Sequence, residues 1–247
     1  MRNCDLWRES KFVFRRGHWS PSSNPRELTP GSRLIAALVA ETYERHLPAF
    51  ASGHLADLGC GKVPFWGMYR EHVTCVTCAD WPYSLHKNLH IDVACNLARP
   101  LPFRDEVFDT VLLSDVLEHI PEPQQCVREI ARILRPNGVL LMNTPFFYWL
   151  HETPHDYYRY TEFALCYLLE QAGFRIEVLE AIGGSPEVFA DLAAKHLATA
   201  PLVGRTLANA ITSGALALRR LRFWRSLSRK SARLLPLGYF VIGRRAV

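Results

Sequence analysis

The chain has 247 residues, of which 49% are hydrophobic and 21% are charged. These values are ordinary for a folded protein. The chain can bury a large hydrophobic core, so neither disulfides nor a structural metal ion are needed to explain its stability. The length suits one large α/β domain, or such a domain with a long insertion.

The net charge of +5 hides an asymmetry along the chain. No Asp or Glu follows Asp191, whereas eleven of the 29 Lys and Arg residues lie between Lys195 and Arg245. The part up to Asp191 therefore holds 18 basic and all 24 acidic side chains, a net charge of −6, and the remainder carries +11. The basic end of the chain needs its own explanation.

Apolar runs alternate with helical patterns along most of the chain. The predicted strands cover residues 55–58, 73–79, 90–94, 108–113, 139–143, 174–181 and 238–243. The predicted helices cover residues 27–47, 65–71, 121–134 and 161–172. Because strands alternate with helices, the sequence predicts an α/β fold in which helices cover both faces of a parallel sheet.

The same order predicts three parts of the chain. Residues 1–53 form an N-terminal helical cover, and residues 54–182 together with 237–247 form the α/β domain. Residues 183–236 form a basic, mostly helical insertion before the last strand.

The most informative stretch runs from His54 to Lys62 and contains Asp57-Leu-Gly59-Cys60-Gly61. It predicts a short buried strand that ends near an acidic residue, followed by a glycine turn and a helix. Glycine lets the backbone bend and approach a ligand where a Cβ would collide. The stretch therefore predicts a small-molecule site at the carboxyl end of the first strand. The structural alternative is that Asp57 and Asp80 only cap neighbouring helices.

Five motifs, in this order, resemble those of class I S-adenosylmethionine-dependent methyltransferases of the small-molecule branch, the type 11-like methyltransferases. They are Asp57-Leu-Gly-Cys-Gly61, Asp80, Leu101-Pro-Phe-Arg-Asp-Glu-Val-Phe-Asp109, Ser114-Asp-Val-Leu-Glu-His-Ile120 and Leu134-Arg-Pro-Asn-Gly-Val-Leu-Leu141. The resemblance implies a Rossmann-like fold with a seven-stranded, mostly parallel sheet whose last strand is antiparallel. It also implies S-adenosylmethionine as cofactor, and methyl transfer to an oxygen or nitrogen of a small molecule, a sugar or a lipid-linked glycan.

The resemblance assigns cofactor roles to individual residues. Asp80 would accept hydrogen bonds from both ribose hydroxyls. Asn96 stands where relatives usually carry Asp, so an amide would accept from the adenine amino group with Leu97 against the ring. Ser114 would contact the amino end of the cofactor. The residues expected at the cofactor are Asp57, Gly59, Cys60, Gly61, Asp80, Asn96, Leu97 and Ser114.

Residues 144–161 follow the fifth predicted strand and contain two histidines, an Asp, an Arg and several aromatic residues. Such a loop at the carboxyl edge of a sheet predicts a substrate pocket. His155 can take a proton from an attacking hydroxyl, Asp156 can orient that imidazole, and Arg159 can hold an anionic group. These three are the predicted catalytic residues. The alternative is a packed loop whose Tyr-Tyr-Arg-Tyr run anchors the next helix.

No metal site is expected in this loop. His151-Glu-Thr-Pro-His155 has the spacing of a zinc-binding His-Glu-x-x-His motif, but Pro154 prevents the single helix that such a motif requires. Glu118 and His119 are either a surface pair at a helix start or neighbours of the substrate, and the sequence does not decide between them.

The basic insertion has two interpretations. Residues 219–233 interleave Leu, Phe and Trp with seven basic residues, which is typical of a helix on an anionic membrane surface. The alternative is a helical lid over the substrate pocket, with its Arg residues solvated or paired with the acidic body. No window has the run of about 18 apolar residues that a membrane span needs.

Cysteine usage and the first residues favour a cytoplasmic protein, or one attached peripherally to the inner membrane face. The seven cysteines are scattered, and we expect core thiols in a reducing compartment rather than zinc ligands or a redox pair. The first 14 residues lack a continuous apolar run, so no signal peptide is predicted.

Two other functions compete with small-molecule methylation. A basic helix can follow phosphates, and RNA methyltransferases share the fold, but no RNA-binding module is visible and no base-methylating motif follows the fourth strand. We therefore do not expect a nucleic-acid partner. A noncatalytic scaffold with a cofactor fold would be expected to lose the glycine turn or Asp80, and both are present.

Overall fold

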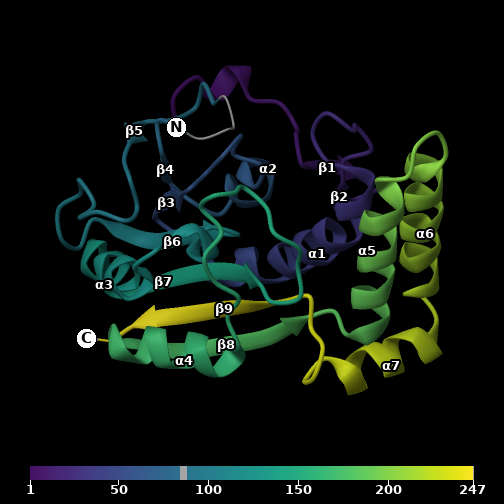
Figure 1. Ribbon diagram of the computed structural model, residues 1–247. Helices are drawn as coiled ribbons and strands as arrows, with labels where there is room; N and C mark the ends of the chain where they lie inside the picture. The colour runs from purple at the N-terminus through teal and green to yellow at the C-terminus, as the bar shows by residue number, and fades with distance from the viewer. Residues whose placement is uncertain (84–87, 247) are drawn as a thin grey trace.

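The computed structural model describes residues 1–83 and 88–246 (Figure 1). Within this part of the chain, one sheet contains β3 (His54–Leu58), β4 (Cys75–Asp80), β5 (Val93–Ala94), β6 (Phe108–Ser114), β7 (Leu134–Pro145), β8 (Phe174–Ile182) and β9 (Gly238–Arg245). The order across the sheet is β5-β4-β3-β6-β7-β9-β8. Strand β9 runs antiparallel to both β7 and β8, and the other neighbours are parallel. The predicted seven-stranded sheet with an antiparallel last strand is confirmed.

Helices cover both faces of this sheet, as predicted. They are α1 (Arg33–Phe50), α2 (Trp66–Tyr69), α3 (Pro123–Ile133) and α4 (Glu162–Gln171). Because side chains alternate along a strand, Leu55 packs with α1 and α2 whereas the adjacent Ala56 packs on the opposite side with α3 and α4. Burial of each large apolar side chain in these two clusters contributes about 1.5–3 kcal/mol.

The ends of α4 follow from its sequence. The Thr161 side chain accepts a hydrogen bond from the backbone N–H of Ala164, and Gly173 beyond the helix has φ +83°. A polar cap and a left-handed glycine are the expected start and stop of a helix. Both boundary predictions are confirmed.

The N-terminal region differs from the prediction. It contains α1, but before it the strands β1 (Phe12–Arg15) and β2 (His18–Pro21) form a hairpin. Arg16 and Gly17 both have positive φ, at 54° and 83°, as two-residue hairpin turns with the right twist require. The description of residues 1–53 as a helical cover is therefore incomplete, and α1 begins at Arg33 rather than at residue 27.

Between β8 and β9 lie α5 (Ser185–Ala198), α6 (Gly204–Leu218) and α7 (Arg222–Ser231). Figure 1 shows α5 and α6 as a neighbouring pair at one end of the sheet, with α7 crossing below them on the way back to β9. Among the described residues, no helix combines the length and the hydropathy needed to cross a bilayer.

The described cysteines are only partly as expected. Cys60, Cys78, Cys95 and Cys126 are buried, whereas Cys4 and Cys75 are exposed. The exposed pair departs from the prediction that the thiols belong to the core.

Candidate functional site

A cavity of about 860 Å³ opens at the carboxyl ends of β3, β4 and β6. Parallel strands bring their carboxyl ends to one edge of a sheet, so residues that follow different strands meet there. Its volume lies within the range of about 300–1,000 Å³ that small-molecule sites occupy.

The glycine turn after β3 forms one wall of this cavity. Gly59 has φ +67°, and a Cβ at this position would lie 2.6 Å from Cγ2 of Val116. Its backbone N–H donates to the carbonyl of Ala79 in β4 at 2.8 Å. Only glycine fits this conformation and this space, so the turn presents bare backbone to a ligand.

Two buried carboxylates flank the turn. Asp57 accepts a hydrogen bond from the Tyr69 hydroxyl at 2.9 Å, and burial raises the pKa of Asp57 to about 7 in spite of this bond. Asp80 accepts from the backbone N–H of Gly61 at 2.8 Å and of Trp81 at 2.7 Å. These bonds fix the direction of the Asp80 carboxylate at the cavity wall.

The remaining predicted cofactor residues also line the cavity. Asn96 is exposed and its Oδ1 accepts from the N–H of Ala98 at 2.9 Å, while Leu97 is buried behind it. The Ser114 hydroxyl donates to Asn143 at 2.7 Å. The structure therefore brings all eight predicted cofactor residues to one cavity. They are Asp57, Gly59, Cys60, Gly61, Asp80, Asn96, Leu97 and Ser114.

The structure places the three predicted catalytic residues differently relative to the cavity. His155 lines the cavity, with Nδ1 3.1 Å from the Tyr157 hydroxyl and its ring against Trp81 at 5.4 Å. Asp156 and Arg159 are not among the lining residues. The Asp156 carboxylate pairs with Arg159 and accepts from the backbone N–H of His151, and it lies 3.3 Å from Nδ1 of His151, so the imidazole beside it is that of His151.

Arg159 holds the loop together. Its guanidinium donates to both Asp156 oxygens, at 2.5 and 2.7 Å, and to the carbonyls of Tyr148, Trp149 and Tyr158. A guanidinium has five N–H donors, and these bonds use them all, so an anionic substrate group has no donor left. Pairing with Arg159 also lowers the pKa of Asp156 to about 2. These contacts favour the alternative interpretation of the loop, in which its Tyr-Tyr-Arg-Tyr run packs and anchors the next helix.

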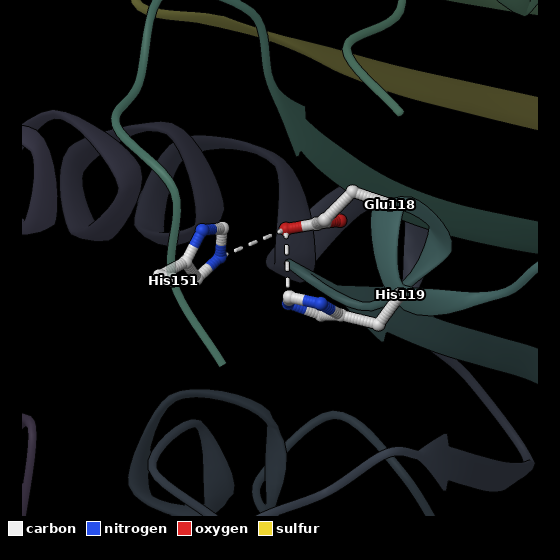
Figure 2. A group of neighbouring side chains, drawn as sticks. All are labelled: Glu118, His119 and His151. Carbon is white, nitrogen blue, oxygen red and sulfur yellow. Dashed lines mark ion pairs between the residues drawn. The ribbon is translucent and has the colours of Figure 1, made fainter. Parts of the chain in front are cut away.

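Glu118, His119 and His151 form a cluster next to the cavity that the sequence did not predict (Figure 2). Glu118 and His119 lie in the 3-10 helix η3 (Leu117–His119) after β6, and His151 comes from the loop after β7. His119 lines the cavity and Glu118 is fully buried, so the pair is not a surface pair. Burial raises the pKa of Glu118. The adjacent Glu-His in the sequence was the signal, but nothing local indicated that His151 would join it.

Comparison with known proteins agrees with this site. The family model described as "Methyltransferase domain" matches residues 56–142, from β3 to β7. These residues form a class I S-adenosylmethionine-dependent methyltransferase domain. S-adenosylmethionine is the cofactor of this domain type, and the glycine turn, the two carboxylates and the cavity volume fit it.

Relatives extend the match beyond the methyltransferase domain. A "Probable S-adenosylmethionine-dependent methyltransferase" of Mycolicibacterium smegmatis is 38% identical over 167 residues, 60% of this chain and 65% of that protein. A ubiquinone biosynthesis O-methyltransferase of Coxiella burnetii is 25% identical over 135 residues, 51% of this chain and 56% of the relative. The alignment thus spans little more than half the length of the curated relatives.

The fold comparison covers more of the chain. The crystal structure of an S-adenosylmethionine-dependent methyltransferase from Mesorhizobium loti superposes with a TM-score of 0.54 at 16% identity, covering 86% of this chain and all of that one. At this identity the similarity shows the shared fold.

Proposed function

We propose that this chain transfers the methyl group of S-adenosylmethionine to a hydroxyl oxygen of a small molecule, a sugar or a lipid-linked glycan. The observation that carries the proposal is the continuity of the cavity. Its lining includes the glycine turn at Gly59 as well as His119 and His155, and its volume of about 860 Å³ has room for a nucleoside and for a second molecule beside it.

The reaction demands little covalent chemistry from the protein. Bound S-adenosylmethionine supplies a methyl group already activated on a sulfonium, so alignment of the acceptor accounts for much of the acceleration. A hydroxyl acceptor must also lose its proton as the oxygen–carbon bond forms and the carbon–sulfur bond breaks. His155 lines the cavity and can take this proton. A nitrogen acceptor, the other option in the sequence, would need no such base when its lone pair is free.

Labelled cofactor tests the proposal. The purified chain, incubated with methyl-labelled S-adenosylmethionine and fractions of a host extract, should move label into a small-molecule or glycolipid fraction. Label found only in RNA would support the nucleic-acid alternative instead. Failure of the folded chain to bind S-adenosylmethionine or its demethylated product in calorimetry would contradict the proposal altogether.

His155→Ala tests the base with that acceptor. We expect turnover to fall by about 10²–10⁴-fold, with unchanged affinity for the demethylated cofactor. His196→Ala is the matched control, because His196 is exposed on α5 and does not line the cavity. Wild-type turnover in the His155 variant would remove this residue from the mechanism.

We also propose that α7 rests on an anionic membrane surface, where a lipid-linked acceptor would be found. No residue of α7 is buried, and Phe223 and Leu227 are exposed among basic side chains, as in interfacial helices. Trp224 does not take part, because it is half-buried and its Nε1 donates to Glu187 at 2.6 Å. No residue of 183–236, a segment described throughout, lines the cavity, so the lid interpretation has no support.

Vesicle co-sedimentation tests this contact. The wild-type chain should pellet with vesicles containing anionic lipid, and Phe223→Ser/Leu227→Ser should pellet less. Neutral vesicles separate charge attraction from apolar insertion. Equal pelleting of the wild type and the double variant would end the membrane proposal.

A further inference from the structure

Glu118 is one of several described residues with buried polar side-chain atoms that lack a hydrogen-bond partner. Its side chain is fully buried, and neither oxygen has a hydrogen-bond partner among the residues that the structure describes. A buried carboxylate without partners costs several kcal/mol in a folded protein. Such a group calls for a ligand that supplies positive charge.

Two imidazoles are directed at the same oxygen of Glu118. The Nε2 atoms of His119 and His151 each lie 3.7 Å from Oε1, too far for a hydrogen bond. Figure 2 shows one oxygen of the carboxylate joined by a dashed line to each of the two rings, which come from different segments. All three potential ligand atoms lie within 4.8 Å of one another. Ligands at about 2.0–2.2 Å around a tetrahedral ion lie roughly 3.3–3.6 Å apart, so a small contraction would complete such a site.

The other nitrogen of each ring is directed away from Glu118, at an oxygen. Nδ1 of His119 lies 2.6 Å from the backbone carbonyl of His155. A carbonyl only accepts, so Nδ1 carries a proton, and in the neutral form of the ring the lone pair is on Nε2, the nitrogen 3.7 Å from Glu118. Nδ1 of His151 lies 3.3 Å from the Asp156 carboxylate, without the geometry of a hydrogen bond. An Nδ1–H at a carbonyl or a carboxylate is the usual second contact of a metal-binding histidine.

We propose that Glu118, His119 and His151 bind a divalent transition-metal ion at the acceptor end of the cavity. Two imidazole nitrogens and one carboxylate oxygen suit Zn²⁺, Fe²⁺ or Mn²⁺ better than Mg²⁺ or Ca²⁺, which prefer oxygen ligands. Three protein ligands leave at least one coordination position open, as catalytic metal sites do. The expectation from sequence, that this region holds no metal, considered only His151 with His155. The structure pairs His151 with Glu118 and His119 instead.

The position of the site suggests what the ion does, and this part rests on the proposed function. His119 lines the cavity, so the open coordination position faces the acceptor. A hydroxyl bound to a divalent ion loses its proton at a lower pH. The ion would therefore orient the acceptor oxygen and favour its deprotonated form before methyl transfer.

Metal binding is measured directly on the full chain after chelator treatment. Titration with Zn²⁺ in a calorimeter should show one site per chain, and Co²⁺ should give the visible absorption bands of a nitrogen- and oxygen-ligated ion. Glu118→Gln and His151→Gln should lower Zn²⁺ affinity by more than the about 10–100-fold that loss of an outer contact costs. His155→Ala, a neighbouring cavity histidine outside the ligand set, should change it less than threefold. Equal affinity in Glu118→Gln and the wild type, or no Zn²⁺ site at all, would overturn the proposal.

Stability separates a metal ligand from a buried ion pair. If Glu118 is a ligand, metal-free Glu118→Gln should unfold at a higher temperature than the metal-free wild type, because the variant buries no unpaired charge. Zn²⁺ should then raise the midpoint of the wild type only. If Glu118 instead pairs with a protonated His151, the variant unfolds at a lower temperature and Zn²⁺ has no effect, which contradicts the proposal. Affinity for the demethylated cofactor, retained in both variants, shows that they are folded.

The two proposals fail separately. Zn²⁺ binding without methyl transfer to any fraction would leave the metal site in place and refute the proposed function. Methyl transfer that continues at the wild-type rate in Glu118→Gln with chelator present would leave the proposed function intact and refute the role of the ion.

Discussion

The cofactor end and the acceptor end of the cavity are built in different ways. At the cofactor end, Asp57, Gly59 and Asp80 lie within two residues of a strand end and are held by hydrogen bonds to a neighbouring strand, turn or helix. At the acceptor end, His119 and His151 come from a 3-10 helix and a loop, and contacts between side chains and backbone join them. One end is thus fixed by the sheet and the other by docking of a loop.

This difference explains how one fold can serve many acceptors. Strand ends of a parallel sheet meet whatever the loops contain, so the cofactor end keeps its geometry. The loop after β7 can change its side chains without disturbing the sheet, so acceptor chemistry can vary there. The comparison predicts that substitutions at the two ends will separate cofactor affinity from loop stability.

The largest effect is expected at Gly59. Gly59→Ala forces a left-handed backbone on an L-residue, at about 1–3 kcal/mol, and overpacking against Val116 adds about 1–3 kcal/mol. We expect both the free energy of unfolding in urea and the affinity for the demethylated cofactor to fall. Gly214→Ala is the control, since its Cβ meets nothing within 4 Å and alanine favours α6 by about 1 kcal/mol. A Gly59→Ala variant with wild-type stability and wild-type cofactor affinity would show that the turn does not require glycine.

At the acceptor end, Arg159→Leu should destabilise the loop without lowering the affinity for the cofactor. The substitution leaves the nearly buried Asp156 carboxylate unpaired, which costs about 3–5 kcal/mol. We expect a lower unfolding midpoint, and at a temperature where the variant is folded, cofactor affinity within threefold of the wild type. Arg159→Lys should recover part of the stability because it keeps the charge. A stable variant that loses only turnover would restore Arg159 to the catalytic residues.

Cofactor affinity should depend on pH through Asp57. Burial holds the pKa of Asp57 at about 7, and the carboxylate form attracts the cofactor's ammonium group. Affinity should therefore rise about tenfold per pH unit between about pH 5 and 7, with proton release measurable by calorimetry in buffers of different ionisation enthalpy. The contribution of Asp57 to folding stability changes with pH in the opposite direction to cofactor affinity. Because the folded pKa is raised above the unfolded value, this residue's contribution to stability is complete below about pH 4 and is lost as the pH rises to about 7.

Asp57→Asn is the control for this pH dependence. The variant should bind the cofactor more weakly at pH 7 and show a flat affinity between pH 5 and 7. An unchanged slope would assign the titration to another group and remove Asp57 from the cofactor contact.

The smallest effect is expected at Asn96, the exposed member of the cofactor end. Asn96→Ala removes one neutral hydrogen-bond acceptor, which is worth about 0.5–1.5 kcal/mol, so cofactor affinity should fall by about 2–12-fold. Asn96→Asp places a charged acceptor at this position and should bind the cofactor at least as tightly as the wild type. Weaker binding by the Asp variant than by the Ala variant would show that the amide is not an adenine acceptor.

Local patterns were sufficient for the parts of the protein that depend on chain order. The alternation of strands and helices predicted the sheet, and the glycine turn with Asp80 predicted the cofactor end. The hairpin at Arg16 and Gly17 was missed because its strands are short and lack a strong hydrophobic alternation. The loop was misjudged because Asp156 had two basic neighbours within reach, Arg159 and His155, and only three-dimensional packing decides which one it pairs with.

The sequence by itself therefore determined the fold, and it predicted which residues after the strands would line one cavity. Both follow from regular spacing along the chain, since the carboxyl ends of parallel strands meet at one edge of the sheet whatever the loops contain. Only the tertiary structure decided the acceptor end, because Glu118 and His151 are separated by more than thirty residues and meet through loop docking. There Glu118 has no hydrogen-bond partner among the described residues and lies 3.7 Å from two imidazole nitrogens, an arrangement that no local pattern along the chain predicts.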